Sequence, residues 1–454
     1  MSIKNKWVLV PIIFSFLISL FYIVVIPGKI KSDAAEYDGL ANSILNGEYS
    51  LDGKPSMERE PGYPLFRATL KVINSSPKFI LFIQLILFCL TIYFVGLISN
   101  KIDPKIGLWG LWGASLSYAL AFYPSTHISE TFVAFLLAIF GYILIKSTEN
   151  PKTMNWIYLS ILSSFIVLTR YPYVIVPISF LIVMSISSFK QKIDKKIIIK
   201  NILVSIFILS TLTGAWLYRN YSTFNEIGFA GRSGAGFYAR AWKADKPWRS
   251  IADSYISTFL GRGILYTVYP NNQSIWLDQW GDWWRDPKVV KEMWGEGMAE
   301  IDKNRKIAAK EIIFKDFNNF SKFIVWSGID TLRLLQLQNP IPTAQGSPFE
   351  GTYGELAKEK NINFIQLTGL GIVHLLQLVW FIAIFVSTYI GFRKYSYKFI
   401  PGVFLISILL VHTIADNIAR YGAPLQPFIL SGIFMTIIYP LYEKHRNNRN
   451  NSSI

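Results

Sequence analysis

The sequence predicts an all-α, polytopic membrane protein, and three observations support this prediction. The chain has 454 residues, of which 52% are hydrophobic, and its mean hydropathy is +0.33. It contains several apolar runs of about 18 or more residues, each long enough to cross a hydrocarbon core of about 30 Å as a helix. Aromatic residues make up 16% of the chain, which suits aromatic belts at both membrane surfaces. Together these properties exclude an ordinary soluble globule.

The apolar runs predict about ten membrane-spanning helices. They lie at about 7–26, 79–98, 106–123, 128–146, 155–168, 172–189, 197–217, 364–389, 399–415 and 423–442. The first run is longer than the apolar core of a typical signal peptide, and no small-x-small cleavage motif follows it closely, so we expect an uncleaved first span. Pro172 disfavours helix in the residue before it, which predicts a tight reversal with Arg170 at its tip.

Charge predicts the orientation of these helices. If the N-terminus is cytoplasmic, the cytoplasmic segments carry 17 of the 45 lysines and arginines, but only four of the 29 acids. The opposite face then carries 28 bases and 25 acids. This asymmetry follows the positive-inside rule, and ten spans return the C-terminus to the cytoplasm. The composition, rich in Lys, Ile and Asn, favours a bacterial cell (inner) membrane.

Charge and cysteine content also limit the partners. The net charge of +16 could indicate nucleic acid, but the bases lie at the ends of apolar runs, so the expected partner is a lipid bilayer and not a nucleic acid. The single cysteine, Cys89, lies within an apolar run, which excludes a disulfide framework and a cysteine metal site.

The chain divides into three predicted parts. Residues 1–217 form an N-terminal transmembrane module with a large first outer loop at 27–78. Residues 218–363 form an extracytoplasmic domain that is long enough to fold by itself, mostly helical to judge from the Lys288–Phe320 pattern. Residues 364–454 form the C-terminal transmembrane helices and a cytoplasmic tail.

The first outer loop is unusually acidic for a connection between spans. It contains seven carboxylates, namely Asp33, Glu36, Asp38, Glu48, Asp52, Glu58 and Glu60. Further polar residues lie at the outer ends of predicted spans: Tyr123, His127, Glu130, Arg170, Arg219, Asn220, Asp416, Arg420 and Tyr421. Charges at such positions are costly unless they face a polar cavity or a partner. Arginine forks match phosphate oxygens and a carboxylate can deprotonate a hydroxyl, so the pattern suits transfer of a group from a lipid phosphate to a hydroxyl or amine.

Several short motifs resemble one family of membrane enzymes. The loop reads Asp33-x-x-Glu36-Tyr37, then Leu40-Ala41, Leu45, Gly47 and Glu60-Pro-Gly-Tyr-Pro64; Ser129-Glu130, Thr169-Arg170, Trp216 to Asn220, and Arg420-Tyr421 with Pro424 and Pro427 follow. In this order they resemble glycosyltransferase family 39, which contains the protein O-mannosyltransferases and the lipid A aminoarabinose transferases and has the GT-C fold. The resemblance covers residues 7–230 well and the last span more loosely, and it does not extend to 230–363.

The resemblance implies an inverting displacement on a polyprenyl-phosphate-linked sugar donor, with an acceptor that the sequence does not identify. Asp33 would be the general base, and Glu36 would be a second acid, although Ala34 stands where the family often has one. Glu130 would orient the acceptor or pair with an arginine. The predicted phosphate-binding residues are Arg170, Arg219 and Arg420, and the predicted substrate-binding residues are Tyr37, Tyr63, His127 and Tyr421. No cofactor is expected, although Asp33, Glu36 and Asp38 leave a divalent cation open, as in the related oligosaccharyltransferases.

Simpler roles and other functions stay open at this point. Asp33 and Glu36 could form a capping box at the start of a helix, and Glu130 could complement a helix dipole. Arg170 could be a snorkelling interfacial base, and Glu58-Arg59-Glu60 could be a solvated face. The alternative functions are an oligosaccharide polymerase, ligase or oligosaccharyltransferase with a pyrophosphate-linked glycan, and, ranked last, a lipid or sugar transporter, which would show mid-membrane charges and two related halves.

Overall fold

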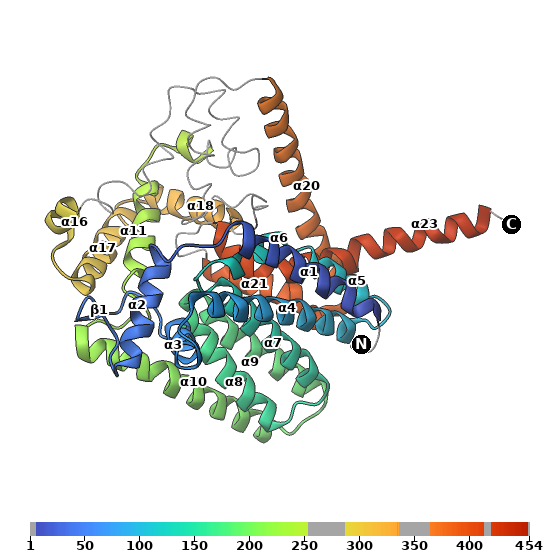
Figure 1. The fold of residues 1–454 in the computed structure, drawn as a ribbon, viewed down its shortest axis with the longest axis horizontal. Helices are drawn as coiled ribbons and strands as arrows, with labels where there is room; N and C mark the ends of the chain where they lie inside the picture. Colours follow the sequence, from blue (N-terminus) through green and yellow to red (C-terminus); the bar gives the residue numbers. More distant parts are fainter. Residues whose placement is uncertain (1–5, 253–286, 334, 336–363, 413–418, 453–454) are drawn as a thin grey trace.

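The structure is a computed structural model, and it describes residues 6–252, 287–333, 335, 364–412 and 419–452 (Figure 1). Within these ranges the chain is almost entirely helical, as predicted. Strand structure there is limited to one hairpin, β1 (Ser50–Leu51) and β2 (Lys54–Pro55), which pair antiparallel with Ser50 opposite Pro55. Its turn residues, Asp52 and Gly53, have φ of 52° and 72°, as the two central residues of a tight hairpin turn require.

In the part of the chain that the structure describes, seven helices are long and apolar enough to cross a membrane. They overlap α1 (Lys6–Val25), α4 (Pro77–Ile102), α7 (Glu130–Glu149), α9 (Ile175–Lys190), α10 (Lys195–Phe224), the C-terminal part of α20 (Phe364–Tyr395) and α22 (Gln426–Ile433). The chain is therefore a multi-pass membrane protein. The last of these spans begins in η5 (Ala419–Leu425) and continues through the π-helix η6 (Phe434–Ile438) into α23 (Tyr439–Ser452).

The other three expected spans are helical but shorter. The run at 106–123 is divided into α5 (Gly107–Ser115) and α6 (Tyr118–Phe122), followed by η1 (Tyr123–Ser125). The run at 155–168 is α8 (Thr153–Thr169), an apolar helix below the length of the seven. The run at 399–415 is α21 (Ile400–His412), and its last expected residues lie outside the described ranges. The count of ten spans accordingly stays a prediction.

The transmembrane core is built around α4 and α7. Fully buried side chains on α4, such as Phe88 and Val95, belong to the same apolar core as Leu137 and Phe140 of α7. Close helix approach depends on glycine at the contact between α5 and α22, because a Cβ on Gly113 would lie 2.5 Å from the carbonyl oxygen of Leu430. In Figure 1 α4, α7, α8 and α9 lie side by side, while α2 and α3 lie at one end of this group.

The first loop and the large second segment fold at the same end of the bundle. The loop contains α2 (Asp33–Leu45) and α3 (Gly62–Ile73). The described part of the second segment contains α11 (Ser233–Ala244), α16 (Pro287–Trp294), α17 (Met298–Ile313) and α18 (Phe317–Arg333), so this part is mainly helical. These helices share a separate apolar core that includes Tyr238, Trp294, Ile313 and Phe323. Figure 1 shows α11 beside α17, and the ion pair between Arg232 and Glu36 joins the start of α11 to α2.

Candidate active site

The two acids at the start of α2 lie on one face of its first turn. The helix begins at Asp33, and the N-cap position belongs to Ser32, whose φ is 49° and whose side chain makes no capping hydrogen bond. The proposed capping box, with Asp33 as N-cap and Glu36 three residues later, is therefore wrong. Residues three apart on a helix are neighbours, so both carboxylates point to the same side of α2, where their negative charge also complements the helix dipole.

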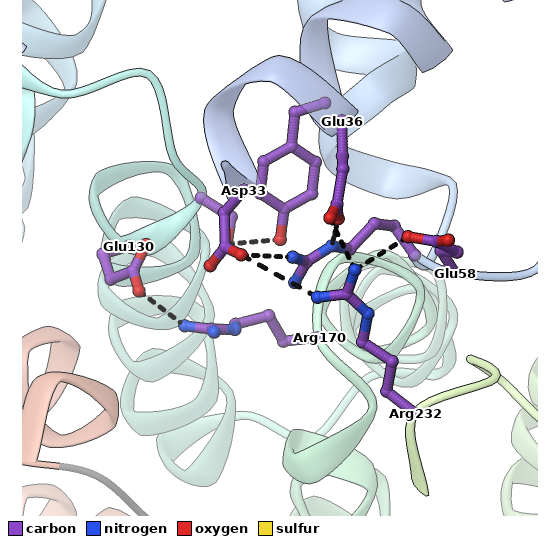
Figure 2. Close-up of polar contacts among 9 residues, drawn as sticks. Asp33, Glu36, Glu58, Glu130, Arg170 and Arg232 are labelled. Atoms are coloured by element: carbon purple, nitrogen blue, oxygen red, sulfur yellow. Dashed lines mark hydrogen bonds and ion pairs between the residues drawn. The ribbon is translucent and has the colours of Figure 1, made fainter. Parts of the chain in front are cut away.

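Two guanidinium groups bind these carboxylates (Figure 2). Arg59 donates from Nη2 to Asp33 Oδ1 at 2.5 Å and from Nε to Glu36 Oε2 at 2.7 Å. Arg232 donates from Nη2 to Glu36 Oε1 at 2.5 Å and to Glu58 Oε2 at 2.7 Å, and its Nη1 lies 3.8 Å from Asp33 Oδ1. The result is a cluster of three carboxylates and two guanidiniums, called the carboxylate–arginine cluster below.

Neither arginine of this cluster is among the site residues that the sequence predicts. Arg59 lies between two acids, Glu58 and Glu60, which made a solvated charged face a reasonable interpretation, but its side chain is only 10% exposed. Arg232 lies outside the motifs that resemble the family. The available signal was local: Gly231-Arg232-Ser233-Gly234 places an arginine among small residues, a composition that allows close approach of the backbone to another segment.

Contacts to both neighbouring segments hold Arg232 in place. The backbone N–H of Gly231 donates to the carbonyl oxygen of Met57 in the first loop at 2.6 Å. On the other side, the buried carboxylate of Asp302 in α17 accepts from the backbone N–H of Gly234 at 2.5 Å and from the Ser233 hydroxyl at 3.1 Å. Asp302 thereby satisfies donors at the N-terminus of α11, immediately after Arg232.

A second ion pair, between Glu130 and Arg170, lies next to this cluster. Arg170 Nη1 lies 3.0 Å from Glu130 Oε1, and the two side chains are 10% and 1% exposed. Glu130 begins α7, while Arg170 adopts an extended conformation (φ −153°) between α8 and η2 (Tyr171–Val174). The predicted reversal at Arg170 is confirmed. Tyr37 lies within electrostatic reach of both Arg170 and Asp33, and Figure 2 draws the ion pair and Asp33 in the same view.

The Glu60-Pro-Gly-Tyr-Pro64 motif connects the first loop to the reversal at Arg170. The Glu60 carboxylate accepts a hydrogen bond from the backbone N–H of Tyr171 at 2.8 Å. A Cβ on Gly62 would lie 2.5 Å from Thr169 Oγ1 and 2.8 Å from the carbonyl oxygen of Leu168, so glycine permits α3 to start against the end of α8. The pKa of Glu60 is raised, because the effect of burial exceeds the opposing effects of the Tyr171 N–H, Arg170 and Arg59. Glu60 therefore lies within electrostatic reach of both arginines.

Tyr37 and Tyr63, two of the residues predicted to bind substrate, pack against each other next to Arg59. The rings of Tyr37 and Tyr63 meet edge to face at 4.9 Å, and the Arg59 guanidinium lies 5.0 Å from the centre of the Tyr37 ring. The hydroxyl of Tyr37 lies 3.4 Å from Ser129 Oγ, next to Glu130. Both tyrosines are almost fully buried, and burial raises the pKa of each.

Asp38 and His127 belong to a different cluster. Asp38 is bound by Arg67 and by Lys71, whose Nζ lies 2.8 Å from Asp38 Oδ1, and Arg67 also donates to the carbonyl oxygen of His127 at 3.1 Å. His127 is 2% exposed. Burial, aided by Arg67 and Lys71, lowers the pKa of His127 to about 4, against an opposing effect of Asp38. His127 is consequently neutral at pH 7.

Two predicted phosphate-binding arginines are not brought to Arg170 by any described contact. Arg219 donates to the carbonyl oxygens of Ser56 at 2.7 Å and Tyr49 at 3.0 Å, and it lies over the rings of Tyr49, Trp216 and Phe224. These hydrogen bonds attach the first loop to α10. Arg420 and Tyr421 lie on η5, but their side chains are outside what the structure describes. The geometry thus brings together Asp33, Glu36, Glu130 and Arg170.

Buried carboxylates and guanidiniums at one end of an apolar helical bundle define a polytopic membrane protein with a polar site at the helix ends. No protein-family model matches the sequence, and no curated protein matches it either.

Comparison with solved structures specifies the fold. The oligosaccharyltransferase of Archaeoglobus fulgidus in its apo form is 13% identical, with a TM-score of 0.50 over 99% of this chain and 53% of that chain. The archaeal oligosaccharyltransferase AglB from the same organism, in complex with an inhibitory peptide and a dolichol-phosphate, is 12% identical (TM-score 0.48; 99% and 52% covered). ArnT from Cupriavidus metallidurans bound to undecaprenyl phosphate is 12% identical (TM-score 0.39; 96% and 78% covered).

The first of these similarities establishes the fold of the chain. It is the GT-C fold of membrane glycosyltransferases, as the resemblance in the sequence implies. The chain spans about half the length of the oligosaccharyltransferase structures it matches. At 13% identity the similarity concerns the path of the chain, so the roles of individual residues rest on the geometry above.

Proposed function

We propose that the chain is an inverting glycosyltransferase that moves a sugar from a polyprenyl-phosphate-linked donor to an acceptor hydroxyl or amine at the outer face of a bacterial cell membrane. One observation carries this proposal. A carboxylate on the first loop, Asp33, and a buried arginine, Arg170, both lie within electrostatic reach of the Tyr37 hydroxyl, at the end of the helical bundle (Figure 2). An acid and a guanidinium at this level can serve an acceptor and a lipid phosphate at the same time.

In the proposed reaction Asp33 accepts the proton of the acceptor O–H or N–H group. The acceptor oxygen or nitrogen forms a bond to the anomeric carbon while the bond between that carbon and the phosphate oxygen breaks. The electron pair leaves with the polyprenyl phosphate, and the configuration at the anomeric carbon inverts. Arg170 stabilises the charge that develops on the departing phosphate.

The contacts around these two residues support this assignment. Arg59 binds Asp33 Oδ1 at 2.5 Å and so orients the carboxylate of the base. Glu130 holds Arg170 at 3.0 Å, which keeps a nearly buried guanidinium paired, since an uncompensated buried charge is strongly destabilising. Glu130 is thus a positioning residue for the phosphate ligand.

The test is transfer by the purified chain in lipid nanodiscs. Donors are undecaprenyl phosphates that each carry one sugar, the acceptor source is a bacterial envelope fraction, and mass spectrometry quantifies the undecaprenyl phosphate released. We expect Asp33→Asn to lower turnover by about 10²–10⁴-fold, as the loss of a general base does, while the chain still shows a cooperative thermal melt. The matched control is Asp52→Asn, which removes an exposed acid of the same loop at a turn position that asparagine tolerates.

Normal turnover by Asp33→Asn would refute the role of Asp33. An undecaprenyl-pyrophosphate-linked oligosaccharide is the comparison donor. Turnover of that donor alone, with none of the single-sugar phosphates consumed, would replace the proposal with an oligosaccharide transferase.

A further inference from the structure

The carboxylate–arginine cluster bears on the divalent cation that the resemblance leaves open. A hard cation such as Mg²⁺ or Mn²⁺ takes carboxylate oxygens as ligands, at about 2.0–2.1 Å for Mg²⁺. The acids considered for this role, Asp33, Glu36 and Asp38, do not converge, because Asp38 is bound to Arg67 and Lys71 instead. In the described part of the chain no group of three or more Asp, Glu, His or Cys side chains is arranged to hold a metal ion.

Glu58 takes the place of Asp38 as the third carboxylate, but arginines lie among the three acids. Each oxygen of Glu36 accepts from a different guanidinium, Oε2 from Arg59 and Oε1 from Arg232. Asp33 Oδ1 accepts from Arg59, and Glu58 Oε2 accepts from Arg232. A cation could reach these oxygens only if both guanidiniums moved away.

We propose that the guanidinium groups of Arg59 and Arg232 stand in the place of a divalent cation among Asp33, Glu36 and Glu58, so that transfer by this chain needs no divalent metal ion. This inference rests on the proposed function for the reaction, but on geometry alone for the ion. Two guanidiniums supply the same formal charge of +2 as one divalent cation, and they leave the three carboxylates with the same net charge.

Displacement of the arginines by a cation is unfavourable for two reasons. Arg59 is almost buried and lies over the Tyr37 ring, so its release from the carboxylates would leave a buried guanidinium without its partners, which is strongly destabilising. Arg232 is attached through its backbone neighbours to Met57 and Asp302, so it cannot withdraw without disturbing the start of α11. Arg232, at the start of α11, thereby supplies one of the two positive charges of the cluster.

Mn²⁺ binding tests this inference without any measurement of transfer. Electron paramagnetic resonance would follow Mn²⁺ added to the purified full chain in detergent. We expect no Mn²⁺ binding at this cluster in the wild-type chain, because the guanidiniums already occupy the carboxylate oxygens. The signal of the wild-type chain with added Mn²⁺ should therefore be the same as that of Glu36→Gln. Arg232→Met removes one guanidinium, and we expect it to bind one Mn²⁺ that the double variant R232M/E36Q loses.

Wild-type binding of Mn²⁺ that disappears in Glu36→Gln would overturn the inference, as would an Arg232→Met chain that remains folded in a thermal melt and binds no Mn²⁺. In the transfer assay, activity should stay within about twofold in excess EDTA, whereas activity lost in EDTA and restored by Mg²⁺ or Mn²⁺ would refute it. If no donor is turned over at all, the proposed function fails while the Mn²⁺ result still decides the nature of the cluster.

Discussion

The carboxylate of Glu60 accepts a hydrogen bond from the backbone N–H of Tyr171 at 2.8 Å, across 111 residues of sequence. This contact connects the first loop to the break between α8 and η2, directly after Arg170. It therefore links the segment that carries the proposed base to the residue that we assign to the phosphate.

Substitution of Glu60 tests this link. Glu60→Ala leaves a buried N–H without its acceptor, which costs about 1–3 kcal/mol and lets the reversal at Arg170 shift. We expect a lower melting temperature and a lower kcat. Glu60→Gln retains an oxygen acceptor and should keep most of both. Equal effects of the two variants would show that the charge of Glu60, and not the hydrogen bond, matters.

Gly62→Ala tests the close approach of α3 to α8. The new methyl group would lie 2.5 Å from Thr169 Oγ1 and 2.8 Å from backbone atoms of residues 168 and 169, and we expect it to lower the free energy of unfolding by about 1–3 kcal/mol, as overpacking does. Gly214→Ala on α10 is the matched control, because a Cβ there meets nothing within 4 Å. Thermal melts in detergent compare the two, and equal stability would contradict the predicted clash.

The Glu130–Arg170 pair predicts different results for its two members. Glu130→Ala leaves a buried guanidinium uncompensated and should cost about 3–5 kcal/mol of stability. Arg170→Lys retains the charge but lacks the planar fork that matches phosphate, so we expect a raised KM for the donor and a lower kcat, with an unchanged KM for the acceptor. Steady-state kinetics with each substrate varied would check this, and an unchanged donor KM would remove Arg170 from the phosphate site.

Asp302 predicts non-additive effects with Arg232. Asp302→Ala should lower kcat because the start of α11, and with it Arg232, loses its fixed position. In the background of Arg232→Met the same change should have little further effect on kcat, since residues that act through one another are not additive. Glu311→Ala, an exposed acid on the same helix, is the control. Additive losses in this double-mutant cycle would show that Asp302 acts independently of Arg232.

His127 predicts a pH dependence of stability. Its pKa is lowered from 6.5 to about 4 in the folded chain, so between these values the unfolded chain binds the proton more readily, and stability falls as pH falls. The contribution is fully present above about pH 6.5 and is lost by about pH 4, with a size on the order of 1–3 kcal/mol. Melting temperatures from pH 7.5 to 4.5 should decline less steeply in His127→Gln than in the wild-type chain. Parallel curves would contradict a neutral buried histidine.

Local sequence patterns were sufficient to predict part of the candidate site. The family-like motifs identified Asp33, Glu36, Glu130 and Arg170, and the structure brings these four together (Figure 2). The sequence also placed Asp38 with Asp33 as a possible cation ligand and Arg219 with Arg170 as a phosphate-binding residue. Neither pair is in contact among the described residues. A charge at a helix end indicates a polar environment, but it does not indicate which of several nearby opposite charges will bind it.

The sequence by itself determined that the chain is a multi-pass helical membrane protein, and it predicted the first loop as the acidic segment and Arg170 as the tip of a reversal. Apolar run length and proline position are local properties, and the exclusion of unpaired backbone polar groups from lipid leaves helix as the only state for such runs. Tertiary structure decided that Arg232, 196 residues from Glu36, completes the cluster around Asp33. That pairing depends on the path of the chain between the two residues, because Coulomb attraction and hydrogen bonding depend on distance in space and not on separation in the sequence.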